Sequence, residues 1–223
     1  MNGILIIDKP KGITSHDVVN IARRVFNIKK VGHAGTLDPI ATGVLIILIG
    51  SATKKSDELL NDDKSYTATL RLGFATDTGD SSGKATRTGS VETLENGAVK
   101  DAIMNFVGEI EQMPPMYSAV KFRGKSLYKW ARKGVEVPRK VRKINIKDIR
   151  IRAISLPEVI FDVTCSKGTY IRQLCADIGD KLGCGGHMAE LRRTRSGAYD
   201  ISQAITVEKL KSLGSDELKS VLI

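Results

Sequence analysis

The chain has 223 residues, of which 41% are hydrophobic and 27% charged, a composition that supports a buried core and excludes disordered, collagen-like and fibrous classes. Its longest aliphatic run, residues 44–49, is far shorter than the roughly 20 residues that span a bilayer, and the 3 cysteines form no CxxC pair, so we expect a cytoplasmic protein without a membrane partner. The 35 basic and 25 acidic residues leave a net charge of +10, which favours an anionic partner or simply high solubility.

Aliphatic runs and alternating patterns along the chain indicate strands, and apolar residues at helical spacing indicate helices. The first strand ends in a Lys-Pro-Lys-Gly turn, after which Thr14 or Ser15 can cap the first helix. On the third strand, Tyr66 shares a face with alternate residues up to Leu72. The expected order is a strand at 4–7, a helix up to Phe26, strands at 44–49 and 64–72, and a long polar surface loop at 73–89.

The rest of the chain mixes the same two patterns. A helix at 99–107 is expected to stop at Gly108, ahead of a Pro-Pro pair through which helices do not run. Because strands and helices do not alternate regularly, we predict an α+β fold and not a doubly wound sheet. The further expected elements are strand arms at 120–122 and 135–137 around a helix at 126–133, strands at 144–151 and 161–165, a helix at 169–182, a Gly-rich turn, an arginine cluster, and a last amphipathic helix.

Basic residues concentrate between Lys121 and Arg152, where 13 Lys or Arg stand with only two acidic residues. This window carries +11, so the remainder of the chain carries −1. Phe122, Tyr128 and Trp130 stand among these cations, and aromatic rings can stack on bases while cations bind phosphates. The window therefore favours nucleic acid, and the alternative is a solvated basic face with a few core aromatics.

Two familiar motifs are incomplete. The segment Gly79–Lys84 has three residues between its glycines where a phosphate-binding loop has four, and Ala85 stands where Ser or Thr is required. Cys184 and His187 are spaced like half a zinc site, but no second pair completes four ligands. We therefore expect neither nucleotide triphosphate hydrolysis nor a metal site.

The most informative segment is the glycine-punctuated stretch 32–43, which places one carboxylate, Asp38, ahead of an aliphatic strand. Loops of this kind often carry chemistry, since the backbone can approach a ligand closely where a residue has no Cβ. The alternative is an ordinary turn in which Asp38 caps the backbone. Residue types and spacing alone do not choose between these interpretations.

Six ordered stretches resemble the TruB family of tRNA pseudouridine synthases, nearly end to end: LIIDKPKGITSHDVV, VGHAGTLDPIATGVL, KSYTATLRLGFATDTGD, PPMYSAVKFRGKSLYKWARKGVEVPR, CSKGTYIRQL and GCGGHMAELRRT. The resemblance implies a mixed, largely antiparallel sheet with flanking helices. It also implies one catalytic domain, residues 1–223, that includes an RNA-gripping insertion at 112–143. Family members usually add a C-terminal PUA domain, which we expect to be absent because the chain ends at Ile223, either as a short form or because it ends early.

The resemblance implies that the enzyme isomerises uridine to pseudouridine at position 55 of the T-loop. Asp38 would be the catalytic carboxylate, and Arg172 would orient it. Tyr66 would lie against the flipped uracil, as either a base or a stacking shelf. The other implied substrate contacts are Tyr170 and Leu191 in the pocket, His33 as a wedge, Lys9 near the site, and phosphate contacts from Lys121, Arg123, Lys125, Arg132, Arg192 and Arg193.

The implied reaction breaks a glycosidic bond and rejoins the base through carbon, so no cofactor is expected. Asp38 could attack the uracil ring, attack the ribose anomeric carbon or remove a ribose proton, and the sequence leaves these routes open. The expected partner is the T-stem and loop of tRNA, bound by a monomer that does not bind DNA. The alternative from a different class is a noncatalytic RNA-binding or RNA-folding module, for which the basic window would suffice.

Overall fold

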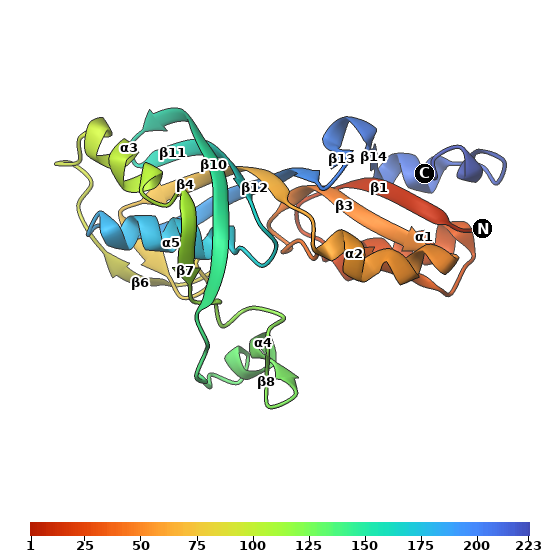
Figure 1. The fold of residues 1–223 in the computed structure, drawn as a ribbon, viewed down its shortest axis with the longest axis horizontal. Coiled ribbons are helices and arrows are strands. Elements are labelled where there is room, and N and C mark those ends of the chain that lie inside the picture. Colours follow the sequence, from red (N-terminus) through yellow and green to blue (C-terminus); the bar gives the residue numbers. More distant parts are fainter. The chain divides into compact units, whose positions relative to one another are not determined.

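The structure is a computed structural model that describes residues 1–223. The chain folds as two compact units (Figure 1). The first contains Met1–Thr67 and Leu191–Ile223, and the second contains Ala68–Glu190. Strands β4 (Lys64–Leu72) and β12 (Gly186–Ser196) run through the boundaries, so each supplies residues to both units.

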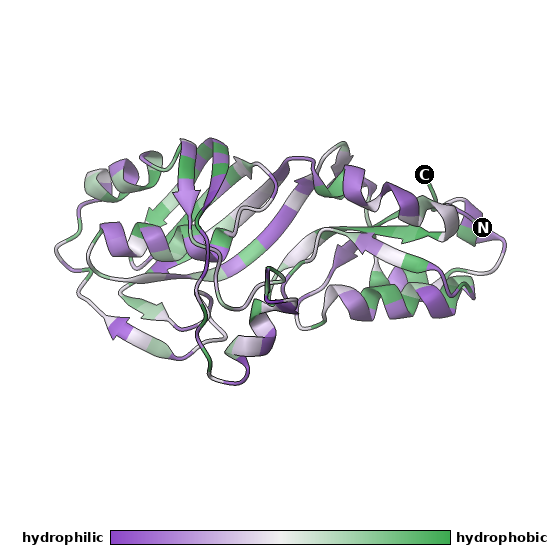
Figure 2. Cartoon of the chain, turned by 60° about the horizontal axis from the view of Figure 1, so that its bottom comes forward, coloured by the Kyte–Doolittle hydropathy of each residue, from purple (hydrophilic) through white to green (hydrophobic).

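The first unit is built around two antiparallel strands, β1 (Gly3–Lys9) and β3 (Thr42–Ile49), which are the expected aliphatic runs. Their apolar residues are buried, and Figure 2 shows the hydrophobic colour along these strands. The strand order is β14-β1-β3-β12, with β2 paired to β3 and β13 paired to β12. The other elements of this unit are α1 (Ser15–Phe26), β2 (Val31–Ala34), η1 (Gly50–Lys55), α2 (Ser56–Leu60), β13 (Tyr199–Asp200), η2 (Ile201–Gln203), β14 (Ile205–Thr206), α6 (Val207–Ser212) and η3 (Glu217–Lys219).

Helix α1 begins where the sequence predicts. Thr14 is its N-cap, and its hydroxyl accepts a hydrogen bond from the backbone N of Asp17 at 3.1 Å. The Asp17 carboxylate accepts in return from the backbone N of Thr14 at 2.8 Å, which completes a capping box. The helix ends at Asn27, which takes the left-handed conformation with φ 50.

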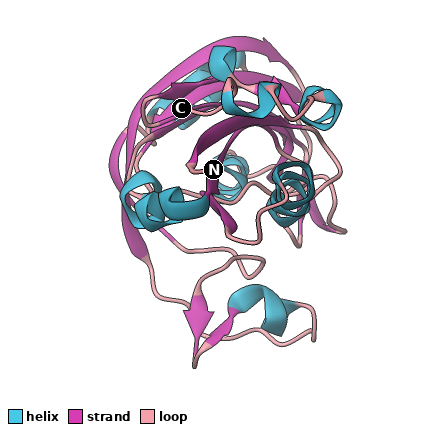
Figure 3. Cartoon of the chain, turned by 90° about the vertical axis from the view of Figure 1, so that its right-hand side faces the viewer, coloured by secondary structure: helices cyan, strands magenta, loops and turns pink.

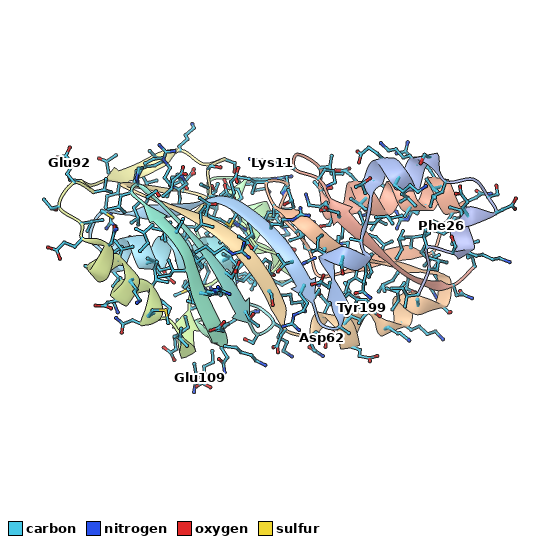
Figure 4. The ribbon with its side chains drawn as sticks, turned by 90° about the horizontal axis from the view of Figure 1, so that it is seen from above. Lys11, Phe26, Asp62, Glu92, Glu109 and Tyr199 are labelled. Carbon is cyan, nitrogen blue, oxygen red and sulfur yellow. The ribbon has the colours of Figure 1, made fainter.

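Tyr199 of β13 packs against the aliphatic cluster of the first unit. Burial raises the pKa of its phenol, and the nearby carboxylate of Asp62 adds to the shift. Figure 4 shows these two labelled residues near each other. The segment after β12 is therefore anchored to the core of the first unit.

The second unit contains a sheet in the order β4-β11-β10-β7. Strands β10 and β11 are antiparallel with irregularities in register, and α5 contributes a buried apolar face to the core (Figure 1). The three cysteines are buried and form no disulfide. The elements are β5 (Phe74–Thr76), β6 (Ala85–Thr88), α3 (Asn96–Met104), β7 (Gly108–Gln112), β8 (Lys121–Phe122), β9 (Lys125–Ser126), α4 (Leu127–Ala131), β10 (Arg142–Ser155), β11 (Glu158–Cys165) and α5 (Ile171–Lys181).

The mixed strand-and-helix architecture that the sequence predicts is confirmed, with mainly antiparallel pairs and two parallel ones, β1 with β14 and β3 with β12. Several local predictions are wrong. Residues 73–89 contain the two-stranded ribbon β5–β6, and the predicted helix at 99–107 ends at Met104, after which β7 follows. The arginine cluster, for which the sequence predicts no particular element, lies on β12.

The predicted arms of the insertion are also corrected. Lys121–Phe122 pairs with Lys125–Ser126 and not with residues 135–137. The reason is the two-residue turn Arg123-Gly124, in which both residues have positive φ, 47 and 79, as a tight hairpin requires. Figures 1 and 3 show β8 and α4 outside the sheet of the second unit. None of the helices is long and apolar enough to cross a membrane.

Candidate active site

Asp38 lies in the loop between β2 and β3, and the first turns of the chain hold this loop in place. The hydroxyl of Ser15 bonds Leu37 twice: it accepts from the backbone N at 2.8 Å and donates to the backbone O at 3.1 Å. The backbone N of Gly12 donates to Pro39 O at 2.8 Å. Asp38 is itself partly buried, and its carbonyl accepts from the N of Ala41 at 3.0 Å. The carboxylate therefore sits on a loop whose backbone is fixed on both sides of it.

Lys9 is fully buried beneath this loop. Its Nζ donates to Pro10 O at 2.9 Å, Ile13 O at 2.8 Å and Pro39 O at 3.4 Å. Burial lowers the pKa of Lys9 to about 8, although the nearby charge of Asp38 opposes the shift. A plain solvated turn is thus excluded, because the ammonium group of Lys9 is enclosed by loop carbonyls.

Arg193 on β12 is also buried, with 1% of its surface exposed. Its Nε donates to Val44 O at 2.6 Å and its Nη2 donates to Gly35 O at 3.0 Å. The guanidinium of Arg193 is therefore used inside the protein, on the carbonyls of Gly35 and Val44. The side chain of Arg192, the preceding residue, is 42% exposed. It binds the Asp8 carboxylate with both Nη atoms, at 2.7 and 3.1 Å.

The loop can approach β12 only because residue 43 is glycine. Gly43 has φ +99, and a Cβ built there would collide with the backbone of Arg193. Gly35 has φ +88, and its Cβ would lie 3.3 Å from Nη1 of Arg193. The glycine spacing of the segment thus reflects the close packing of the loop on Arg193.

Three further predicted residues belong to the first unit. His33 on β2 is partly buried, and burial together with the positive charge of Arg193 lowers its pKa, so its ring is neutral at pH 7. The Nδ1 atom of His33 is buried without a hydrogen-bond partner. Tyr66 on β4 is partly buried, and Leu191 on β12 is 8% exposed.

Arg172 lies in the first turn of α5, in the second unit, and is 5% exposed. Its Nη1 donates to Thr78 O at 2.9 Å, and its Nη2 donates to Tyr117 O at 2.8 Å. Its Nε lies 3.7 Å from the Asp80 carboxylate. An ordinary surface cation is therefore excluded, because this guanidinium is fixed in orientation by two loop segments.

Asp80 is a buried carboxylate that the sequence analysis missed. It is 5% exposed, and its Oδ1 accepts from the hydroxyl of Thr78 at 2.8 Å, from the backbone N of Ser82 at 3.0 Å and from the Ser82 hydroxyl. Asp80 stands in the segment 79–84, whose two glycines resemble those of a phosphate-binding loop. In the structure the carboxylate of this segment faces Arg172.

Tyr170 is the N-cap residue of α5, and it is joined to β7 by a second buried residue that was missed, Gln112. The backbone N of Tyr170 donates to Gln112 Oε1 at 2.9 Å, and Gln112 Nε2 donates to Tyr170 O at 3.1 Å. Because Gln112 is where the insertion begins, this pair fixes the start of α5 relative to the base of the insertion.

The insertion places its aromatic rings and its cations in direct contact. Arg123 lies over Phe122 at 5.4 Å, Lys125 over Trp130 at 5.6 Å and Arg132 over Tyr128 at 5.5 Å from the ring centroids. Phe122 and Trp130 also meet edge to face, at 6.3 Å between centroids. The predicted phosphate contacts Lys121, Arg123, Lys125 and Arg132 are all exposed.

A cavity of about 480 Å³ lies elsewhere in the second unit. Its lining includes Arg71 and Glu158, which form an ion pair at 3.2 Å. It also includes His187 and Phe74, whose ring centroids lie 4.3 Å apart. None of the predicted site residues lines it. Side chains alternate between the two faces of a strand, so Arg71 and the buried Leu70 lie on opposite faces of β4.

Two family models together match most of the chain. The model "TruB family pseudouridylate synthase (N terminal domain)" matches residues 23–171, and "tRNA pseudouridylate synthase B C-terminal domain" matches residues 172–222. The chain is 50% identical over 223 residues to tRNA pseudouridine synthase B of Syntrophotalea carbinolica, which covers 100% of this chain and 73% of that protein. It is 53% identical over 217 residues to the tRNA pseudouridine synthase B of Alkaliphilus oremlandii, with 97% and 72% covered.

Solved structures agree in fold. A chain of the "Crystal Structure of a Cbf5-Nop10-Gar1 Complex" superposes with a TM-score of 0.77 at 32% identity, covering 99% of this chain and 57% of that one. A chain of the "Structure of H/ACA RNP bound to a substrate RNA containing 2'-deoxyuridine" gives a TM-score of 0.73 at 29% identity, covering 99% and 56%. This chain thus spans just over half the length of those solved chains. The family identification made from the six sequence stretches is confirmed, and the chain belongs to the TruB family of pseudouridylate synthases.

Proposed function

We propose that this enzyme converts uridine to pseudouridine in tRNA, at position 55 of the T-loop, with Asp38 as its catalytic carboxylate. The observation that carries the proposal is the Asp38 loop. Its backbone is held by Ser15, Lys9 and Arg193, which is the fixed geometry that a reacting group needs. About half of the residues are identical to those of tRNA pseudouridine synthase B over the full chain, which supports tRNA as the substrate.

The reaction is an isomerisation that balances without an added reagent. The bond between N1 of uracil and C1' of the ribose breaks, the base turns, and a bond between C5 and C1' forms. C5 loses a proton and N1 gains one. Asp38 acts by attacking the ring, by attacking C1' or by removing a ribose proton, and each route requires one positioned carboxylate.

The base to be isomerised must leave its stack, which costs a few kcal/mol. In our proposal Tyr66, Tyr170 and Leu191 receive the uracil, and the neutral ring of His33 fills the space that the base leaves. Arg172 orients Asp38, and it is suited to that role because its own guanidinium is fixed by Thr78, Tyr117 and Asp80. We propose that residues 1–223 form one catalytic domain.

The insertion, residues 112–143, is proposed to bind the T-stem and loop. Its exposed cations neutralise phosphates, and its aromatic rings offer stacking surfaces. Arg192 is proposed as a further phosphate contact, since 42% of its side chain is exposed. We propose a cytoplasmic monomer, for which the three buried free thiols are suited to a reducing compartment.

The test is incubation with an unmodified tRNA transcript, followed by nearest-neighbour analysis of the product. We expect pseudouridine at position 55 with the wild-type enzyme and none with Asp38→Asn, which should bind the transcript with nearly unchanged affinity. Asp57→Asn is the matched control, because Asp57 is an exposed residue of α2 in the same unit. A preparation that binds the transcript tightly but never forms pseudouridine supports the noncatalytic RNA-binding module instead.

A further inference from the structure

We propose that Arg193 is a positioning residue for this reaction, which fixes the Asp38 loop by binding its two ends with one guanidinium group. The inference rests on the proposed function, and it assigns Arg193 no contact with RNA.

The geometry is specific to an arginine. Gly35 lies on the N-terminal side of Asp38 and Val44 on its C-terminal side, and their carbonyls accept from two nitrogens of the same planar group, at 3.0 and 2.6 Å. Because the guanidinium is rigid, the two carbonyls are held at a set separation. A lysine in the same place has a single nitrogen on a flexible stem, so it cannot hold both carbonyls in this way.

The burial of Arg193 also points to a role beyond packing. A charged side chain that is 1% exposed normally has a carboxylate partner. The guanidinium of Arg193 instead donates to two backbone carbonyls, those of Gly35 and of Val44 in β3. An apolar side chain could fill the same volume without the cost of removing a charge from water. It could not donate hydrogen bonds to the carbonyls of Gly35 and Val44.

The charge of Arg193 reaches the other groups of the site. It lowers the pKa of Lys9 and of His33, so it lies close to both. Lys9 and Arg193 thus place two buried positive charges against the loop that carries Asp38.

The first measurement is the single-turnover rate at saturating enzyme, together with the Kd for tRNA and its salt dependence. For Arg193→Met we expect the rate to fall about 100-fold, as loop displacements near 1 Å do, with the Kd and salt slope unchanged. Arg193→Lys should recover part of the rate. Arg23→Met is the matched control, because Arg23 also donates to a strand carbonyl of the same unit, Val31 O at 3.1 Å, but away from the loop.

The second measurement needs no turnover. Amide hydrogen exchange across residues 35–44 of the free protein should quicken in Arg193→Met and not in Arg23→Met. If Arg193→Met does not fold, Gly35→Ala is the second variant, because the added Cβ would lie 3.3 Å from Nη1 of Arg193 and displace its guanidinium. Amide exchange across residues 35–44 should then quicken as well.

The alternatives have distinct outcomes. A weaker Kd with a flatter salt slope and an unchanged saturated rate would mean that Arg193 contacts phosphate, and the inference would be wrong. Unchanged exchange in the loop would also overturn it. If wild-type enzyme makes no pseudouridine while loop exchange still depends on Arg193, the proposed reaction fails and the positioning of the loop stands.

Discussion

The guanidinium of Arg172 donates to the backbone carbonyl of Tyr117 at 2.8 Å, so the first turn of α5 is tied to the beginning of the segment 112–143. The same group lies 3.7 Å from Asp80, which is its acidic partner inside the second unit. The orientation of Arg172 therefore depends on a carboxylate that does not need to touch RNA.

We predict that Asp80→Asn lowers the free energy of unfolding by about 3 kcal/mol, because it removes a buried negative charge that faces the guanidinium of Arg172. Turnover of tRNA should fall as well, since Arg172 loses part of what orients it. Urea unfolding and single-turnover rates measure the two effects. Asp101→Asn, an exposed residue of α3, should change neither, and equal stability of the two variants would contradict the prediction.

Replacement of Lys121, Arg123, Lys125 and Arg132 by glutamine should weaken tRNA binding and flatten its salt dependence. Each lost phosphate contact removes about 0.7 to 0.9 from the slope of log K against log salt. The saturated rate should stay unchanged. The control replaces four exposed lysines outside the window, Lys84, Lys100, Lys209 and Lys211. If both quadruple variants shift the slope equally, the insertion is not a dedicated RNA-binding surface.

Lys9 should make the stability of the protein depend on alkaline pH. Its pKa is about 8 in the folded state and 10.5 as the reference value, so the unfolded state binds more protons between those two pH values. The free energy of unfolding should therefore rise across that window, by about 3 kcal/mol in full, relative to Lys9→Met. Urea unfolding at pH 7, 8, 9 and 10 measures the difference. Lys54→Met, at an exposed position, should retain the rise, and a rise of equal size in Lys9→Met would disprove the assignment.

Gln112→Leu should destabilise the enzyme by about 2 kcal/mol, because the backbone N and O of Tyr170 lose their partners in a buried place. Thermal or urea unfolding gives the number. Gln173→Leu serves as the comparison, since Gln173 bonds only the side chain of Asp177 on the same helix. Stability loss that is no larger than in the comparison would show that the α5 start is held by other contacts.

The sequence predicts well the elements whose pattern is set by burial. β1, β3, α1 and α5 each present a continuous apolar run or stripe, and Thr14 and Asp17 mark the start of α1 by local chemistry. The ribbons β5–β6 and β8–β9 are missed because backbone pairing forms them from mostly exposed residues, which carry no apolar period.

Among site residues, the type of side chain does not predict how deeply it is buried. The family resemblance implies that Lys9 lies near the site and that Arg193 contacts phosphate, and in the structure both charges are used on backbone carbonyls beneath the Asp38 loop. The roles of Asp80 and Gln112 could not be predicted from the sequence, because their partners, Arg172 and Tyr170, are distant along the chain. Charge indicates a preference for negative groups, and it does not say whether those groups belong to RNA or to the protein itself.

The glycine at position 43 sets a limit on how this enzyme can be re-engineered. The atoms in its way are the main chain of residue 193, which every amino acid possesses. A library that randomises both positions and selects for active clones should accordingly return only glycine at 43, whichever residue stands at 193. No compensating mutation at the neighbour can open that space.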